Sequence, residues 1–114
     1  MDTNGGLLMV TDDTFETEVI RSKLPVVVDF YADWCAPCRT AEPILVELSK
    51  SLTGRVKFAK VNVDDSDAVA RSFGIHSIPT YLFLESGREK GREIGALGGP
   101  TEFRSVLKRY FSFA

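Results

Sequence analysis

The chain has 114 residues, of which 44% are apolar and 26% are charged, and its formal net charge at pH 7 is −2. These values are typical of one globular domain with a single core, and they argue against a basic nucleic-acid-binding protein. No apolar run approaches the roughly 18 residues that span a bilayer, and the first residues lack the basic and apolar segments of a signal peptide. We therefore expect a cytoplasmic protein, with residues 1–6 as a flexible lead-in and residues 7–114 as one domain.

The hydrophobic pattern of the first part predicts a strand, a helix and a second strand. Leu7 to Val10 is a short apolar run, and Thr11 is a suitable N-cap for a helix that Pro25 ends. Residues 26–31 are almost all apolar and largely β-branched, which is typical of a strand buried on both faces. Helices are therefore expected on both sides of the sheet that contains this strand.

Both cysteines of the chain lie between this strand and the next predicted helix, Arg39 to Leu52, in the sequence Trp34-Cys35-Ala36-Pro37-Cys38. A strand that leads through a turn into a helix places Cys35 at the helix N-terminus, where unpaired N–H groups and the helix dipole favour a thiolate. Cys38 follows one turn later on the same face and can form a disulfide with Cys35. Pro43 predicts a kink inside the helix.

Three other interpretations of the cysteine pair are open. A structural disulfide over so short a loop would add only about 2 kcal/mol and would join nothing distant. A zinc site needs two more Cys or His ligands, and the chain offers only His76, so no metal is expected. The pair could also be two inert buried thiols. The CxxC spacing close to a βαβ pattern favours a redox-active dithiol instead.

The second half of the chain predicts a mixed arrangement of strands and helices. Its expected elements are a strand over 56–63, a short helix between Asp64 and Gly74, strands over 80–84 and 89–94 joined by a turn, and a last helix from Pro100 to Tyr110. The order βαβαβαββα requires parallel crossovers early and adds antiparallel strands late. The prediction is an α/β fold with a central mixed sheet.

Several motifs in order resemble the thioredoxin family over residues 7–112: Val28-Asp29-Phe30, the Trp34–Cys38 motif, Lys60-Val61-Asn62-Val63-Asp64, Ser77-Ile78-Pro79-Thr80 and Gly95-Ala96. The resemblance implies the thioredoxin fold, a central five-stranded mixed sheet flanked by four helices. It also implies a thiol–disulfide oxidoreductase without a cofactor, in which Cys35 attacks and Cys38 resolves the mixed disulfide. Ala36 departs from the commonest family motif, which has glycine there, and this affects the expected redox potential.

Two charged residues are expected to support the chemistry. Asp29 could lie at a strand end, but burial would raise its pKa and suit it to exchange a proton with Cys38 through water. Lys60 could tune Asp29, or it could be a solvated strand end. Pro37, between the cysteines, carries no charge, and the absence of a histidine there favours a reductant.

A second set of residues is expected to contact partners. The resemblance implies that the bond before Pro79 is cis, which leaves the Ile78 backbone free to pair with a bound chain. Trp34, Gly95 and Ala96 complete an apolar rim, although Trp34 could simply belong to the core.

We therefore expect a monomeric general protein-disulfide reductant. Its partners would be protein disulfides and a thioredoxin reductase that recycles it, without nucleic acid or membrane. An exported or specialised thioredoxin-like oxidase or isomerase is the alternative within enzymes. A non-enzymatic binding subunit that uses the apolar rim is the alternative outside them.

Overall fold

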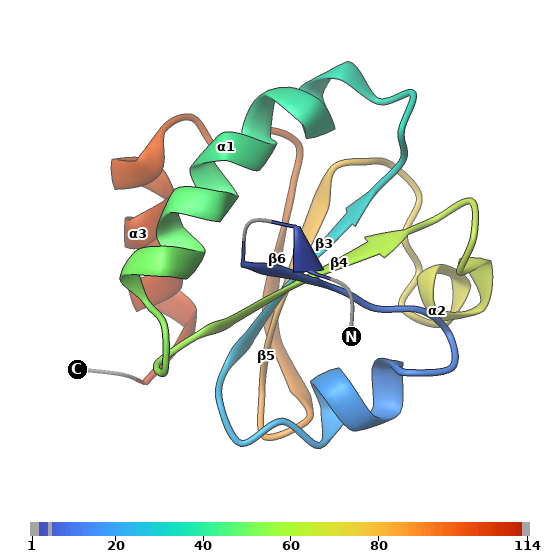
Figure 1. Cartoon of the computed structure of the whole chain (residues 1–114), viewed down its shortest axis with the longest axis horizontal. Helices are drawn as coiled ribbons and strands as arrows, with labels where there is room; N and C mark the ends of the chain where they lie inside the picture. The colour runs from blue at the N-terminus through green and yellow to red at the C-terminus, as the bar shows by residue number, and fades with distance from the viewer. Residues whose placement is uncertain (1–2, 5, 113–114) are drawn as a thin grey trace.

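Strand β3, Val26–Tyr31, lies inside a mixed sheet in the computed structural model of the chain, which describes residues 3, 4 and 6–112. The strands follow the order β1-β2-β4-β3-β5-β6 (Figure 1). β4 pairs in parallel with β2 and β3, whereas β5 is antiparallel to β3 and β6. The bounds of the other strands are β1 Thr3–Asn4, β2 Leu7–Met9, β4 Lys57–Asn62, β5 Thr80–Glu85 and β6 Arg88–Ile94.

The five predicted strands are confirmed as β2 to β6, and the pairing directions agree with the predicted topology. The two-residue strand β1 is an addition, because the sequence led us to expect a flexible lead-in over residues 1–6. Thr3 and Asn4 pair with Leu8 and Leu7, and Gly6 has a φ of +98° in the connection between the two strands. Residues 1, 2 and 5 of the lead-in lie outside the described residues.

Two helices cover each face of the sheet (Figure 1). α1, Ala36–Ser51, and α3, Pro100–Tyr110, pack on one face through a core cluster that includes Leu48, Phe83 and Phe103. η1, Glu16–Ile20, and α2, Asp67–Ser72, pack on the other face. The all-buried pattern of β3 follows from this two-sided cover, as the sequence predicted. Within the described part of the chain, none of the helices has the length and apolar character needed to cross a membrane.

The helix predicted to begin at Thr11 is the element that differs most from expectation. Thr11 O accepts hydrogen bonds from the N–H groups of Thr14 and Phe15, but the helix η1 itself is a wider, π-type turn that starts at Glu16. The Arg21 N–H reaches Glu16 O, five residues back. Thr11 therefore does not cap η1. The N-cap residue of η1 is Phe15, whose side chain makes no capping hydrogen bond.

The other elements lie close to their predicted bounds. α1 continues through Pro43 to Ser51 without a break. It begins at Ala36 rather than at Arg39. The turn between β5 and β6 is a two-residue loop in which Ser86 and Gly87 have φ values of +54° and +77°. Two positive φ values are typical of a type I′ hairpin turn, so the chain reverses in fewer residues than the predicted turn over 85–88.

Candidate active site

Cys35 and Cys38 form a disulfide at the start of α1. Cys35 is the N-cap residue of the helix, with an extended backbone, and its sulfur accepts a hydrogen bond from the Cys38 N–H at 3.2 Å. A sulfur atom thus takes the place of the oxygen that usually satisfies a free N–H group at this position. A hydrogen-bond donor in this position favours a charged sulfur over a neutral one, so the geometry is compatible with the thiolate expected from the sequence.

The two residues between the cysteines are exposed and build the first helical turn. Pro37 lies in this turn, where its missing N–H removes no hydrogen bond from the helix. Cys35 and Cys38 are each only 4% exposed. Ala36 and Pro37 therefore form exposed surface directly beside the buried disulfide.

The chain returns to the disulfide at the cis Ile78–Pro79 bond, which agrees with the predicted cis-proline. Ile78 packs against the cluster of Tyr31, Cys35 and Cys38. Pro79 O accepts a hydrogen bond from the Gly95 N–H at 2.8 Å, so the β6–α3 loop lies beside the cis bond. Residues from three distant parts of the sequence thereby meet near the C-terminal end of β3.

Trp34 is 69% exposed, so it does not belong to the core, and its Nε1 donates to Asp64 Oδ2 at 2.9 Å. Trp34 and Ile78 line a groove of about 360 Å³ that also includes His76. Ala36, Pro37 and Ala96 line a second, mostly apolar groove of about 460 Å³ on the other side of the cysteines. Apolar surface that a partner could cover thus lies on both sides of the disulfide. The hydrogen bond to Asp64 could not be predicted, because it joins two loops.

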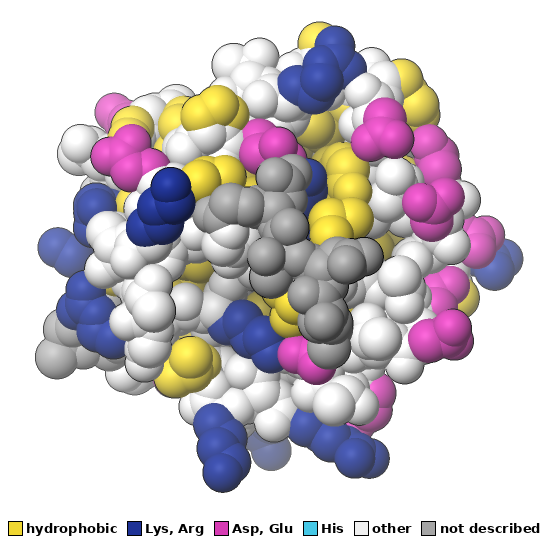
Figure 2. Space-filling view, viewed as in Figure 1, with side chains coloured by type: hydrophobic (Ala, Val, Ile, Leu, Met, Phe, Trp, Pro, Cys, Tyr) yellow, Lys and Arg dark blue, Asp and Glu magenta, His cyan; other side chains and the backbone are white. Residues whose placement is uncertain are grey.

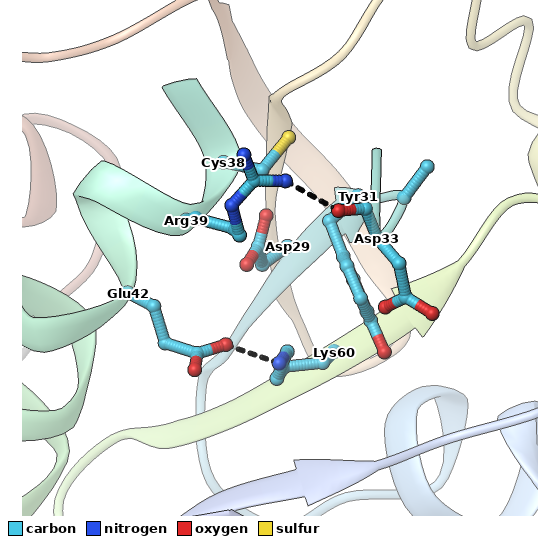
Figure 3. Close-up of a pocket in the computed structure, with 8 residues that line it drawn as sticks. Asp29, Tyr31, Asp33, Cys38, Arg39, Glu42 and Lys60 are labelled. Carbon is cyan, nitrogen blue, oxygen red and sulfur yellow. Dashed lines mark hydrogen bonds and ion pairs between the residues drawn. The ribbon is translucent and has the colours of Figure 1, made fainter. Parts of the chain in front are cut away.

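Asp29 lies in β3 and is only 3% exposed. Burial raises the pKa of its carboxyl from the usual 3.8 to about 7, against the opposing effect of the positive charge on Lys60, while Glu42 raises the pKa further. Asp29 Oδ1 is buried without a hydrogen-bond partner among the described residues. Asp29 and Cys38 line the same cavity of about 260 Å³ (Figure 3). This cavity has room for water between the carboxyl and the sulfur.

Lys60 lines the same cavity, but its ammonium is hydrogen-bonded to Glu42 Oε1 on α1 (Figure 3). Its Nζ also lies 4.2 Å from the centre of the Tyr31 ring. Lys60 is therefore a buried residue, and the interpretation as a solvated strand end is wrong. The role of Glu42 was missed, although its position four residues after Cys38 puts both side chains on one face of the helix.

These features define the class of protein. A CxxC disulfide at a helix N-terminus, close to a cis-proline and a buried acid, is typical of proteins that catalyse thiol–disulfide exchange. Within the described residues, no three His, Cys, Asp or Glu side chains gather as metal ligands would. The chain is a thiol–disulfide oxidoreductase.

Comparison with known proteins identifies the family. The thioredoxin family model matches residues 6–109, which is most of the chain. The chain is 46% identical over 86 residues to a thioredoxin of Rickettsia bellii, and the match covers 75% of this chain and 82% of that protein. It is 41% identical over 103 residues to a thioredoxin of Pyropia yezoensis, with 90% and 95% of the two chains covered. The chain belongs to the thioredoxin family.

A third relative is longer than this chain. The M-type chloroplastic thioredoxin of Brassica napus is 44% identical over 107 residues, which are 94% of this chain but only 60% of that protein. The chain therefore spans less than two thirds of the length of this relative, and the similarity extends over almost the whole of the chain described above.

Proposed function

We propose that the protein is a general protein-disulfide reductant that works through the Cys35–Cys38 pair. The observation that carries this proposal is the placement of the pair at the N-terminus of α1, with uncharged Ala36 and Pro37 between the sulfurs. A charge-neutral intervening pair provides no extra cation to stabilise the thiolate, and a strongly stabilised thiolate is what makes a CxxC protein oxidising. The pair therefore favours donation of electrons to a target.

The reaction transfers two electrons in two exchange steps. The Cys35 thiolate attacks one sulfur of the target disulfide, and the other target sulfur leaves as a thiolate. Cys38, once deprotonated, then attacks Cys35 Sγ, and the second target sulfur leaves. The products are a target dithiol and the Cys35–Cys38 disulfide. Asp29 is the proposed acceptor of the Cys38 proton, through water in the cavity that both residues line.

The target would be held as an extended segment beside the cis-proline. Such a segment can form backbone hydrogen bonds with Ile78, as in other cases where a peptide pairs with an exposed backbone. Trp34 on one side and Gly95 and Ala96 on the other would contact its side chains. The proposed contacts involve few charges, which suits a reductant that accepts many different targets.

We propose that a thioredoxin reductase recycles the oxidised form and that the protein works as a monomer in the cytoplasm, supporting electron transport to protein disulfides and cell redox homeostasis. Nucleic acid and membrane are not expected as partners. Acidic side chains gather on the side of the molecule where α2 lies (Figure 2), and the net charge is −2. The Brassica napus relative is named as chloroplastic, so a reducing plastid compartment is the alternative location.

Reduction of insulin disulfides tests the proposal. The wild-type protein should reduce insulin, Cys35→Ser should abolish the reaction, and Cys38→Ser should accumulate mixed disulfides on Cys35. Capture of targets on Cys38 in a Cys35→Ser protein, and never on Cys35, would reverse the two roles. A reduction potential close to that of oxidising CxxC proteins would favour the oxidase or isomerase alternative, and binding that is indifferent to Cys35 would favour a binding subunit.

A further inference from the structure

Apart from the exposed residues Asp33 and Arg39, the cavity below Cys38 is lined by two carboxyl groups and one ammonium group. Asp29 comes from β3, Lys60 from β4 and Glu42 from α1, and all three line this cavity (Figure 3). The Lys60 side chain is 6% exposed, whereas the Glu42 side chain is 33% exposed. The ammonium is hydrogen-bonded to Glu42, and Asp29 Oδ1 has no partner among the described residues. The ammonium is thus hydrogen-bonded to the more exposed of the two carboxyl groups, that of Glu42.

The other titratable groups near Asp29 do not alter this competition at neutral pH. Burial raises the pKa of Tyr31 to about 12 and raises that of Tyr81 as well, so both rings stay neutral. Arg39 Nη1 donates to the backbone O of Asp33 at the mouth of the cavity. Both Arg39 and Asp33 are exposed, so solvent screens their charges.

Two carboxylates close to one ammonium compete for it, and they also repel each other in a low-dielectric site. One of them binds a proton more readily than an isolated carboxyl would. Glu42 keeps part of its hydration and is hydrogen-bonded to the ammonium, whereas Asp29 is buried and the charge of Lys60 only partly offsets the effect of burial on its pKa. The proton therefore goes to Asp29.

We propose that Glu42 is a positioning residue of the proton-transfer site, which holds the Lys60 ammonium and thereby keeps Asp29 able to bind and release a proton near neutral pH. Without Glu42, the ammonium would be free to stabilise the Asp29 carboxylate. Asp29 would then be deprotonated at a lower pH and would be a weaker base toward the Cys38 thiol. The inference deepens the proposed function, because it rests on Asp29 as the proton acceptor.

The experiment is a titration of the Asp29 carboxyl by NMR in the oxidised, full-length protein. The disulfide removes both thiols from the titration, so Asp29 is observed without them. Glu42→Gln should lower the Asp29 midpoint by on the order of one pH unit, because it removes a nearby negative charge and releases Lys60. Glu47→Gln is the matched control, since it makes the same change at an exposed position of α1 and should leave the midpoint unchanged. An unchanged or raised midpoint in Glu42→Gln would overturn the proposal.

A second pair of variants tests whether Glu42 acts through Lys60. In a Lys60→Met background, Glu42→Gln should shift the Asp29 midpoint much less than in the wild type, because no ammonium remains to be released. If Glu42→Gln shifts the Asp29 midpoint equally with and without Lys60, then Glu42 acts only by direct repulsion of Asp29. That result would overturn the positioning role. Lys60→Gln replaces Lys60→Met if the methionine variant does not fold.

The pH profile of the exchange reaction separates this proposal from the proposed function. In Glu42→Gln, the midpoint for resolution of the mixed disulfide by Cys38 should move to lower pH together with the Asp29 midpoint. Wild-type protein that reduces insulin, combined with a Glu42→Gln profile that does not move, contradicts only the role of Glu42. Wild-type protein that fails to reduce insulin contradicts the proposed function, whatever the titration shows.

Discussion

Asp29 is less stable as a charged group in the folded chain than in water. Its side chain lies in the cavity below Cys38, and the cost of removing a carboxylate from water exceeds the attraction to Lys60, because burial is the largest cause of its raised pKa. The buried Asp29 carboxylate lowers the stability of the fold, but it places a proton acceptor close to Cys38. The consequence can be measured through the pH dependence of stability.

We predict that Asp29→Asn stabilises the protein, and more so at high pH. The folded-state pKa of Asp29 is about 7, above the usual 3.8, so the folded state binds more protons between these values, and wild-type stability falls as pH rises through this window. The raised pKa corresponds to a loss of wild-type unfolding free energy of at most about 4 kcal/mol. Most of this loss should appear between about pH 5 and about pH 8 when unfolding by urea is measured.

Asp65→Asn, at an exposed position, is the matched control and should leave the slope of stability against pH unchanged. The Asp29→Asn protein should also resolve mixed disulfides more slowly than wild type. If wild type and Asp29→Asn have the same stability at both pH values, the carboxyl is not desolvated as described.

The residues of the site were largely predictable where local pattern determines them. The position of Cys35 follows from a strand, a turn and a helix in succession, and the burial of Asp29 follows from the apolar strand around it. The partner of Lys60 was not predictable, because Glu42 and Lys60 are brought together by the packing of α1 on β4. Charges on different elements leave no periodic signal in a sequence.

At the scale of the element, the first turn of α1 determines the environment of the disulfide. Ala36 is the first residue of the helix, and it lies between the two cysteines. Alanine favours helical backbone over glycine by up to about 1 kcal/mol, and only the part that differs between the two redox states changes the potential.

We predict that Ala36→Gly changes the reduction potential by roughly 5–15 mV, since about 30 mV corresponds to 1.4 kcal/mol for two electrons. Equilibration of both proteins with a glutathione buffer measures the difference. The mechanism should be unchanged, so insulin reduction should persist. A shift well beyond about 30 mV would mean that residue 36 acts by something other than backbone propensity.

The first turn of α2 is capped by a residue from a loop that is distant in sequence. Asp12 directly follows Thr11, and its Oδ1 accepts from the Val69 N–H at 2.9 Å and its Oδ2 from the Ala68 N–H at 3.4 Å. The Asp12 N–H also donates to Ser66 Oγ at 3.3 Å. A loop more than fifty residues away along the sequence thus satisfies the free N–H groups of α2.

We predict that Asp12→Ala lowers the free energy of unfolding by about 1 kcal/mol, which is the usual cost of losing a helix cap. Asp13→Ala is the control, because Asp13 is an exposed neighbour of the same type. Chemical denaturation of the two variants compares them directly. Equal loss in both would indicate an effect of charge alone, rather than of the hydrogen bonds to α2.

At the scale of the whole molecule, the C-terminal end of α3 approaches the sheet closely at Gly91. The Tyr110 ring stacks on Phe83 with centroids 5.1 Å apart, and its hydroxyl donates to Glu93 Oε2 at 2.6 Å. Gly91 on β6 makes room for this ring, because a Cβ atom at Gly91 would overlap it. The absence of a side chain at Gly91 therefore allows the C-terminal helix to close over the core.

We predict that Gly91→Ala costs about 1–3 kcal/mol, as overpacking usually does. Thermal unfolding should show a melting temperature lower by roughly 4–8 °C for each kcal/mol. Lys90→Ala, at an exposed position of the same strand, should have little effect. A Gly91→Ala protein as stable as wild type would show that the Tyr110 ring can leave this position at no cost.

The architecture as a whole was predictable because the apolar pattern alternates clearly between strands and helices. The sequence did not predict strand β1 or the π-type geometry of η1. β1 is only two residues long, and η1 depends on a hydrogen bond whose i to i+5 spacing has no counterpart in a helical pattern of apolar residues. Both differences lie at the start of the chain, where short elements leave few residues from which to judge a period.

The outer strand β6 has a further consequence for how copies of the protein meet. An antiparallel pairing of two β6 strands centred on Gly91 would place Glu89 opposite Glu93 and Lys90 opposite Arg92. Each of these pairs joins like charges, which is unfavourable directly across a strand pair. The irregularity at Phe83 and Leu84 also interrupts the ladder beside this strand. In this register the exposed sheet edge is thus disfavoured for continuation of the sheet into a second copy.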